Sequence, residues 1–424
     1  MTNEPLFNKG TILNNTIKII DYIGSGGQGE VYLVKYYDKQ YALKWYYAHI
    51  VNQNLKRVII NLISKGAPNQ HFLWPIKLVE ENNQFGYLME LRPPNYRSLN
   101  EWVKLEFDMN LSTIALACFK LTNAFNKLHA IGLSYKDISL DNIFVDPKRG
   151  DILICDNDNI TANGINVGGL LGTPKFMAPE LVMGSTIPNT ESDQFSLAVL
   201  LFYILLVSHP FEGRLEANIT CFNDISAKML YGTDAVFIYD EANPSNRPVL
   251  GIHNNAINLW PIYPKYIRDL FHKTFTIGVR NPLKRTRESE WRTAFLKLYN
   301  SLFKCSNCGQ ENIYELKKYQ SQGKLDPCIY CKQDFQIPPR IGIKDNIIVL
   351  SEEKGLFVCH INPNEPANLT LVGRINKISS DYIITNVSKL NWKINGQKIL
   401  PQMSKTLING DIIDFGLTTG EIRF

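Results

Sequence analysis

Apolar and polar residues alternate along positions 11–45, which is the pattern of strands with one buried face. Three strands are expected there, and the turn between the first two contains the glycine-rich stretch 24–29. The spacing of apolar residues then changes to that of an amphipathic helix. Its apolar face consists of Leu55, Val58, Ile59, Leu62 and Ile63. A second amphipathic helix is expected over residues 111–130. A sheet followed by helices predicts an α+β fold for the first part of the chain.

Residues 134–158 combine short apolar strands with polar side chains that suit a metal site. Strands are expected at residues 143–145 and 152–154, joined by a turn. Asp137 and Asn142 precede the first strand, and Asp156 follows the second. A loop and hairpin of this kind can bring two carboxylates and an amide into one pocket. Because Mg²⁺ prefers oxygen ligands, the stretch predicts a metal and phosphate site.

The length and composition indicate a multidomain protein. The chain has 424 residues, of which 45% are apolar and 20% are charged, enough for several packed cores. Its net charge of +5 is small for this length, so no specific nucleic-acid binding is expected. The longest apolar run, residues 197–207, is shorter than the ~20 residues of a membrane helix and predicts a buried core helix. No membrane association is expected. The N-terminus lacks signal-peptide features, so a cytoplasmic location is expected.

Four of the eight cysteines form two Cys-x-x-Cys pairs. The pairs are Cys305/Cys308 and Cys328/Cys331, and 19 residues separate them. Four thiolates at this spacing suit a closed tetrahedral Zn²⁺ site. In a reducing compartment the pattern indicates a metal site rather than disulfides. A structural zinc ribbon is therefore predicted over residues 301–337.

Short strands punctuated by turn residues follow a Pro-Pro linker at residues 338–339. Strands are expected at residues 347–350, 355–358 and 381–384. Asn-Gly pairs at residues 395–396 and 409–410 favour tight hairpins. The spacing of these strands predicts an all-β sandwich over residues 338–424.

The motifs of residues 1–160 resemble those of the protein kinase family. The stretch 24–29 resembles the glycine-rich loop over the ATP phosphates, and Tyr-Ala-Leu-Lys at residues 41–44 resembles the Val-Ala-Ile-Lys motif. Asp137, with Asn142 five residues later and Asp156 further on, resembles the catalytic loop and metal site of kinases. The resemblance implies phosphoryl transfer from ATP.

The activation segment of kinases also has a counterpart. Residues 172–180, Gly-Thr-Pro-Lys-Phe-Met-Ala-Pro-Glu, resemble its end, where a polypeptide substrate lies. The resemblance implies that Thr173 approaches the catalytic aspartate and marks serine/threonine specificity. It implies an ion pair between Glu180 and Arg285, and a buried Asp193 that braces the backbone of the catalytic loop. The expected phosphorylation sites of the segment are Thr161 and Thr173.

The resemblance implies a bilobal kinase fold. The expected N-lobe is residues 1–92 and the expected C-lobe is residues 93–300, with ATP between them. The implied catalytic residues are Asp137, Lys44 and Thr173. The implied ATP-binding residues are Gly24, Gly26, Gly29, Val31, Ala42, Lys44, Met89, Glu90, Arg92 and Phe144. Mg²⁺, or Mn²⁺, is expected on Asn142 and Asp156. Asp158 is expected as a further ligand of this metal site, and the alternative for it is a solvated loop residue.

Several positions depart from the kinase pattern. Tyr135 and Lys136 replace His-Arg, Ser139 replaces the usual lysine of the loop, and Asn157-Asp158 replaces Phe-Gly. No Asp or Glu occurs between Asp38 and Glu80, so the helix glutamate that pairs with the strand lysine is missing. Lys44 is therefore expected to be oriented by a residue other than this glutamate, or only once ATP binds. The candidates are Asn54, Asn61 and Asp156.

These features predict a protein serine/threonine kinase that transfers the γ-phosphoryl group of Mg-ATP to a Ser or Thr hydroxyl. The departures favour an alternative, a pseudokinase that acts as a nucleotide-binding scaffold. A third reading, a small-molecule phosphotransferase, is favoured only by the spacing of Asp156 and Asp158.

The C-terminal strands resemble forkhead-associated (FHA) domains at Val372-Gly373-Arg374 and at residues 407–416. FHA domains bind phosphothreonine, so phosphopeptide contact through Arg374 is implied. The order of the three modules, residues 72–75 and the Asp-Asn-Asp motif resemble atypical bacterial kinases linked to tellurite-resistance operons. That resemblance implies a role in stress signalling and a von Willebrand-type partner protein.

Overall fold

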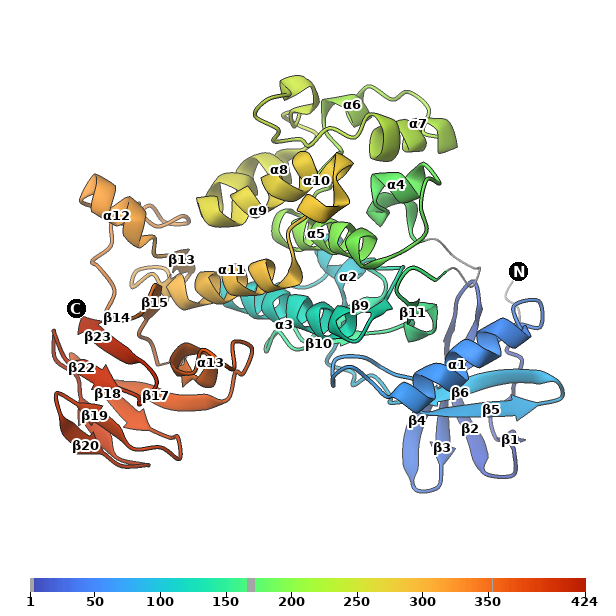
Figure 1. The fold of residues 1–424 in the computed structure, drawn as a ribbon, viewed down its shortest axis with the longest axis horizontal. Coiled ribbons are helices and arrows are strands. Elements are labelled where there is room, and N and C mark those ends of the chain that lie inside the picture. Colours follow the sequence, from blue (N-terminus) through green and yellow to red (C-terminus); the bar gives the residue numbers. More distant parts are fainter. Residues whose placement is uncertain (1–3, 166–171, 353) are drawn as a thin grey trace. The chain divides into compact units, whose positions relative to one another are not determined.

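The computed structural model describes residues 4–165, 172–352 and 354–424, shown as a ribbon in Figure 1. The chain divides into two units. Unit 1 comprises Met1–Asp108, Lys120–Tyr263 and Arg268–Ser289, and unit 2 comprises Met109–Phe119, Pro264–Ile267 and Glu290–Phe424. The helices α3 (Leu111–Ala130), α9 (Lys265–Phe275) and α11 (Glu288–Ser301) contribute residues to both units.

Unit 1 begins with an antiparallel sheet in the order β1-β2-β3-β4-β6-β5. Its strands are β1 (Ile12–Leu13), β2 (Ile17–Ser25), β3 (Gly29–Tyr36), β4 (Lys39–Tyr46), β5 (Lys77–Glu81) and β6 (Gln84–Met89). Alternating apolar side chains of these strands, such as Ile17, Ile19, Val34 and Leu43, form one buried cluster. The strands expected over residues 11–45 are therefore confirmed.

Helix α1 (Gln53–Lys65) lies along one face of this sheet (Figure 1). Asn52 begins it, because the Asn52 side chain accepts a hydrogen bond from the Leu55 N–H at 2.9 Å. Gly66, with a φ of 73°, ends it. The helix buries Ile59 and Leu62 against the sheet, as the apolar spacing predicted.

The rest of unit 1 is mainly helical. Its helices are α2 (Leu99–Val103), α4 (Pro179–Val182), α5 (Thr190–Leu206), α6 (Arg214–Ala217), α7 (Asp224–Lys228), α8 (Asn254–Leu259) and α10 (Ile277–Arg280), with parts of α3, α9 and α11. Helix α5 is buried along most of its length, as the apolar run at residues 197–207 predicted.

Two small sheets in unit 1 position the polar residues that were expected to form the metal site. Strands β9 (Ile143–Val145) and β10 (Ile152–Ile154) pair antiparallel, and β7 (Arg97–Ser98) pairs with β9. Strand β8 (Leu133–Ser134) pairs with β11 (Thr161–Ala162). The hairpin expected at residues 143–154 is confirmed. It places Asn142 and Asp156 beside the same cavity and Asn142 in contact with Asp137.

Unit 2 contains the cysteine region and two further sheets. Strands β12 (Leu302–Lys304) and β13 (Glu311–Ile313) pair antiparallel, and helix α12 (Leu316–Gln322) follows them. The next sheet has the order β15-β14-β23-β22-β19-β20, and the last has the order β16-β17-β18-β21. Side chains from both of these sheets form one core around Trp392. This arrangement confirms an all-β C-terminal region.

The bounds of these strands correct two expectations. The strands are β14 (Arg340–Ile343), β15 (Asn346–Val349), β16 (Leu356–Phe357), β17 (Leu371–Ile378), β18 (Asp381–Asn386), β19 (Trp392–Ile394), β20 (Gln397–Ile399), β21 (Ser404–Thr406), β22 (Ile412–Asp414) and β23 (Thr419–Arg423). The strand expected at residues 355–358 is shorter, because Val358 already begins helix α13 (Val358–Ile361). The Asn-Gly pair at residues 409–410 makes no hairpin, because β21 and β22 belong to different sheets.

The other Asn-Gly pair forms the expected turn. Asn395 and Gly396 join the antiparallel strands β19 and β20 with φ values of 50° and 81°. A two-residue type I′ turn requires positive φ at both positions, which Asn and Gly adopt most easily. Within residues 4–165, 172–352 and 354–424, no helix has the length and apolar character needed to cross a membrane.

Lys354 provides a test of packing within unit 2. Its buried ammonium group donates hydrogen bonds to the carbonyls of Tyr299 and Leu302, at 2.8 and 2.6 Å. Tyr299 lies at the C-terminal end of α11, where a positive charge is favourable. We expect Lys354→Met to lower the free energy of unfolding by about 1–3 kcal/mol, since hydrogen bonds to a charged group are lost. Calorimetric unfolding measures this change. The matched control is the exposed Lys393→Met, and equal stability of the two variants would contradict the assignment.

Candidate active site

A cavity of about 750 Å³ lies in unit 1 beside the glycine-rich turn. Its lining includes every residue expected to bind ATP, namely Gly24, Gly26, Gly29, Val31, Ala42, Lys44, Met89, Glu90, Arg92 and Phe144. Asn142 and Asp156, two of the expected metal ligands, also line it. The structure therefore gathers these residues around one space, although they come from segments as far apart in sequence as Gly24 and Asp156.

The glycine-rich turn joins β2 to β3 and covers this cavity. The Gly26 N–H donates to the Gly29 carbonyl at 2.9 Å, which closes the turn. Gly29 must be a glycine, because a Cβ atom there would lie 2.1 Å from the carbonyl oxygen of Trp45. The glycines of the turn expose backbone to the cavity, which lets phosphate oxygens approach the N–H groups.

Apolar and aromatic groups form the opposite part of the cavity. Ala42 on β4 pairs with Met89 on β6, and both line the cavity. The guanidinium group of Arg92 lies over the Phe144 ring, 4.2 Å from its centroid. A flat apolar space of this kind suits a nucleotide base.

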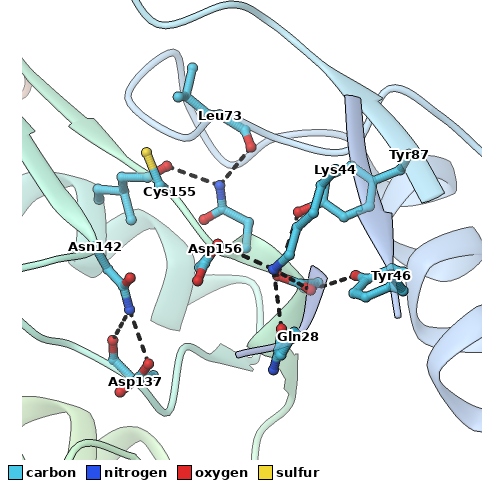
Figure 2. Close-up of polar contacts among 12 residues, drawn as sticks. Gln28, Lys44, Tyr46, Leu73, Tyr87, Asp137, Asn142, Cys155 and Asp156 are labelled. Atoms are coloured by element: carbon cyan, nitrogen blue, oxygen red, sulfur yellow. Dashed lines mark hydrogen bonds and ion pairs between the residues drawn. The ribbon is translucent and has the colours of Figure 1, made fainter. Parts of the chain in front are cut away.

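Lys44 reaches the cavity from β4 and is held by carboxylates. Its ammonium nitrogen lies 2.8 and 3.0 Å from the two Asp158 oxygens, 3.2 Å from Asp156 Oδ1 and 3.1 Å from Gln28 Oε1. Figure 2 shows the lysine ending beside Asp156 and Gln28. Burial lowers the pKa of Lys44, but Asp158 and Asp156 outweigh burial and raise it, so the amine is charged.

The expected orienting residues of Lys44 are confirmed only in part. Asp156 contacts the amine, whereas Asn54 and Asn61 are exposed on α1 and do not. An amide from this helix is therefore the wrong partner.

Asp158 occupies a different environment from Asp156. Its side chain is 1% exposed, against 45% for Asp156. The Tyr46 hydroxyl donates to Asp158 Oδ2 at 2.5 Å, and the Tyr87 hydroxyl lies 3.5 Å from Oδ1. Burial and the Asp158 charge raise the pKa of Tyr46, which keeps this hydroxyl a donor. The expectation of a solvated loop residue is wrong, and the carboxylate faces Lys44 rather than the cavity.

Asp137, Asn142 and Thr173 meet on the other side of Asp156. The Asn142 amide nitrogen donates to Asp137 Oδ2 at 3.0 Å and to the Asp137 carbonyl at 2.8 Å. Figure 2 shows this contact. The Thr173 hydroxyl donates to Asp137 Oδ1 at 2.7 Å, so the expected approach of Thr173 to the aspartate is confirmed. The Asn142 amide oxygen, with Asp156, provides the oxygen ligands that Mg²⁺ prefers.

Asp193 on α5 fixes the backbone of the loop that precedes Asp137. Asp193 accepts hydrogen bonds from the N–H groups of Tyr135 and Lys136 at 2.5 and 3.0 Å, which confirms its expected bracing role. His129 lies between Asp193, at 3.1 Å, and Glu288, at 2.6 Å. Burial lowers the pKa of His129, but hydrogen bonds to Asp193 and Glu288 outweigh burial and raise it to about 9. The imidazolium therefore holds two buried carboxylates together.

Asn157 ties the turn after β10 to the segment before β5. Its side-chain nitrogen donates to the carbonyls of Leu73 and Ile154 at 2.8 and 2.9 Å, and the residue is fully buried. The backbone of residues 71–73 also bonds to Ile154, at 2.7 and 2.9 Å. At the position of Asn157, where most kinases have an apolar side chain, this chain has a side chain that hydrogen-bonds two backbone segments together.

The activation segment is fixed by an ion pair with Arg285. The expected pair is present: the two terminal nitrogens of the Arg285 guanidinium group, Nη1 and Nη2, lie 2.7 Å from Oε1 and Oε2 of Glu180, respectively. Arg285 is buried, so this pair is fixed by a bidentate contact. Of the two expected phosphorylation sites, Thr161 is buried in β11, and the Thr173 hydroxyl donates to Asp137.

The four expected zinc ligands come together in unit 2. The ligand atoms of Cys305, Cys308, Cys328 and Cys331 all lie within 4.8 Å of one another. The Sγ atoms are 3.7 Å apart for Cys305/Cys331 and 3.6 Å apart for Cys308/Cys328. Tetrahedral Zn²⁺ with Zn–S bonds of about 2.3 Å requires sulfur separations of about 3.8 Å. The cluster therefore fits a structural zinc ion.

Each cysteine pair forms the same backbone loop. Cys305 and Cys328 donate their N–H groups to the carbonyls five residues later, both at 2.8 Å. Gly309 and Lys332 donate back to the carbonyls of these cysteines, at 2.9 and 3.0 Å, and both have positive φ. Burial raises the pKa of Cys328, but backbone N–H donors outweigh it and lower the pKa to about 6, which favours a thiolate.

The expected phosphopeptide residue is not on a loop. Arg374 is an exposed residue within β17, paired across the sheet with Thr385 on β18. FHA domains bind phosphothreonine through loop residues, and this position differs from that pattern.

A sequence model of the protein kinase domain matches residues 17–276, which is more than half of the chain. The chain belongs to the protein kinase family. Domains of this family bind ATP and a divalent metal ion. The kinase domain accounts for the cavity between the glycine-rich turn and the β9–β10 hairpin.

The relatives of this kinase domain are distant. Protein kinase MCK1 of Saccharomyces cerevisiae is 27% identical over 139 residues, which are 32% of this chain and 37% of that protein. Serine/threonine-protein kinase pkn2 of Myxococcus xanthus is 22% identical over 234 residues, 49% of this chain and 26% of that protein. Probable serine/threonine-protein kinase gdt4 of Dictyostelium discoideum is 26% identical over 236 residues, which are 49% of this chain and 14% of that protein. The chain thus spans well under two thirds of these curated relatives.

Some contacts in the site were not expected from the sequence. They are the ion pair of Lys44 with Asp158, the contact with Gln28, the backbone hydrogen bonds of Asn157 and the pairing of Glu288 with His129. One signal did exist: since the helix glutamate is missing, a carboxylate from another segment had to neutralise a buried strand lysine.

The pKa of His129 gives a pH prediction. Because its folded pKa is raised, the stabilisation by His129 is complete below its ordinary value near 6.5 and is lost as pH rises through about 9. We expect the free energy of unfolding to fall by about 3 kcal/mol across this range.

Denaturation from pH 6 to 10 measures this change. His129→Gln should be less stable at pH 7 and show a flatter profile, with the exposed His49→Gln as control. A wild-type profile as flat as that of His129→Gln would contradict the charged histidine.

Proposed function

We propose that the chain is a protein serine/threonine kinase that transfers the γ-phosphoryl group of ATP to a Ser or Thr hydroxyl. The observation that carries this proposal is the convergence of Lys44, Asp156 and Asn142 around one cavity. Asp137 lies beside them, 3.0 Å from the Asn142 amide nitrogen and 2.7 Å from the Thr173 hydroxyl. A scaffold that only binds nucleotide has no need of an aspartate held beside the substrate platform.

The residues around the cavity fit ATP and a divalent metal. The backbone of the glycine-rich turn and the ammonium group of Lys44 would hold the phosphates, and Asn142 and Asp156 would hold Mg²⁺ or Mn²⁺. When bound, the metal neutralises phosphate charge. Asp137 would orient the substrate hydroxyl and accept its proton, and its orientation is fixed by Asn142 and by the loop that Asp193 braces.

The activation segment supports a polypeptide substrate. The buried pair of Glu180 and Arg285 fixes the segment that follows Thr173, and Arg285 also donates to the Glu191 carbonyl at 2.8 Å at the start of α5. Thr173 beside Asp137 supports serine/threonine specificity, since its hydroxyl marks where a small hydroxyl side chain can approach. The reading as a small-molecule phosphotransferase loses its basis, because Asp158 does not face the cavity.

The remaining assignments are part of the same proposal. The proposed domains are an N-lobe of residues 1–92, a C-lobe of residues 93–300, a zinc ribbon of residues 301–337 and an FHA-like sandwich of residues 338–424. The proposed setting is cytoplasmic stress signalling of the tellurite-resistance type, with a von Willebrand-type partner protein. Phosphopeptide contact through Arg374 is the least supported part, because this residue lies within a strand.

A pseudokinase scaffold is the second candidate. Ser139 replaces the lysine that usually neutralises the transferred phosphoryl group, and it is buried with 3% exposure. The site therefore lacks one positive charge of an ordinary kinase. Slow turnover or nucleotide binding without transfer would follow from this loss.

Phosphoryl transfer tests the proposal. With γ-labelled ATP and Mg²⁺ or Mn²⁺, we expect label on Ser or Thr of the protein itself or of a generic substrate. Asp137→Asn and Asp156→Asn should each reduce the rate by at least roughly a hundredfold, because proton transfer or metal binding is lost.

The exposed Asp345→Asn serves as the matched control for this assay and should keep the wild-type rate. If the wild-type protein transfers no label while ATP still raises its melting temperature, the scaffold is the correct function.

Metal analysis tests the zinc site. The purified protein should contain about one zinc ion per chain, and Cys308→Ser should lose it and lower the stability of unit 2, because the metal supplies part of the folding energy. Elemental analysis gives the content, and Cys221→Ser, an exposed cysteine outside the cluster, is the control. Equal zinc in both variants would exclude the cluster as its site.

A further inference from the structure

We propose that Asp158 is the positioning residue of Lys44 and takes the place of the missing helix glutamate. As a result, one turn, residues 156–158, carries both the lysine partner and a proposed metal ligand. This inference rests on the proposed kinase function and assigns Asp158 a role different from metal binding.

The contacts of Asp158 point to the lysine. Both of its oxygens lie within hydrogen-bond distance of the Lys44 ammonium group, at 2.8 and 3.0 Å. Tyr46 and Tyr87 approach the same carboxylate from the sheet. The oxygens are thus occupied by donors, and the side chain is 1% exposed. A carboxylate in this position holds a cation in place and is closed to a metal ion in the cavity.

Asp156 shows what a metal ligand requires. Its side chain is 45% exposed, lines the cavity with Asn142 and makes a single contact of 3.2 Å with Lys44. The two aspartates lie two residues apart, but their environments separate their roles. Asp156 keeps oxygens open to the cavity, while Asp158 fixes the lysine behind it.

Helix α1 cannot supply the partner. Residues 53–65 contain no Asp or Glu, and the last turn of the helix is fixed by Trp74, whose indole N–H donates to the Leu62 carbonyl at 2.7 Å. In kinases with a helix glutamate, movement of the helix breaks the lysine pair. Here the carboxylate that pairs with the lysine comes from the turn after β10 and not from α1.

The conformation of the turn is fixed instead. Asp156 has φ 49° and ψ 45°, a left-handed conformation that is uncommon for non-glycine residues, although Asp and Asn adopt it more readily than most. The next residue, Asn157, restrains the turn through its buried hydrogen bonds to Leu73 and Ile154. Loss of the turn would therefore remove the lysine partner and displace the metal ligand in one step.

A double-mutant cycle tests the pairing. The variants are Lys44→Met, Asp158→Asn and the double variant, with Asp156→Asn for comparison and Asp345→Asn as control. Calorimetric titration with ATP, with and without Mg²⁺, measures nucleotide affinity, and thermal unfolding measures stability.

We expect Lys44→Met and Asp158→Asn each to weaken Mg-ATP binding by roughly tenfold to a hundredfold, and the double variant to be no weaker than the weaker single variant. Asp158→Asn should keep the ratio of affinities with and without Mg²⁺, whereas Asp156→Asn should lose it. Lys44→Met should lower the melting temperature, since it leaves a buried carboxylate unpaired, and Asp158→Asn should recover part of that loss in the double variant.

Additive effects in the cycle, or loss of the Mg²⁺ ratio in Asp158→Asn, would overturn the inference. The thermal-unfolding measurements distinguish failure of the Asp158 inference from failure of the proposed kinase function. If the wild-type protein binds no ATP, the kinase proposal fails, but recovery of melting temperature in the double variant still shows whether Asp158 is the partner of Lys44.

Discussion

The buried ion pair between Lys44 and Asp158 is the contact on which the arrangement of the site depends. A buried ammonium group is costly unless a carboxylate neutralises it with good geometry. Lys44 lies on the sheet and Asp158 lies on the turn after β10, so the pair fixes the turn against the sheet. Tyr46 and Tyr87 satisfy the remaining oxygen positions. Lys44 lines the cavity, and this ion pair sets the position of its ammonium group there.

A second set of buried charges fixes the other side of the cavity. Asp193 holds the backbone of the catalytic loop, and the imidazolium of His129 joins Asp193 to Glu288 on α11. Arg285 and Glu180 hold the activation segment in a similar way. The side chains of Asp137, Asn142 and Thr173, which meet in the proposed site, therefore project from a backbone that is fixed by ion pairs at several points. Preorganisation of this kind is what phosphoryl transfer requires of a protein.

Much of this architecture could be predicted from the sequence, because strands and helices leave a periodic pattern. The sheet of residues 11–45, helix α1, the β9–β10 hairpin and the four-cysteine cluster were all expected. The resemblance to kinases also implied the pair of Glu180 with Arg285. The role of Asp158 could not be read in this way, since a carboxylate near a metal motif has the same local sequence whether it faces the cavity or a buried lysine.

Turns show the same limit. The two Asn-Gly pairs look alike in sequence, but only Asn395-Gly396 joins neighbouring strands, and the pair at residues 409–410 leads from one sheet to the other.

The most direct test of the whole account is a crystal structure with Mg²⁺ and a non-hydrolysable ATP analogue. It should show the nucleotide in the cavity, Mg²⁺ on Asn142 and Asp156, and Lys44 between the phosphates and Asp158. Mg²⁺ bound to Asp158, or an empty cavity with saturating nucleotide, would contradict the account.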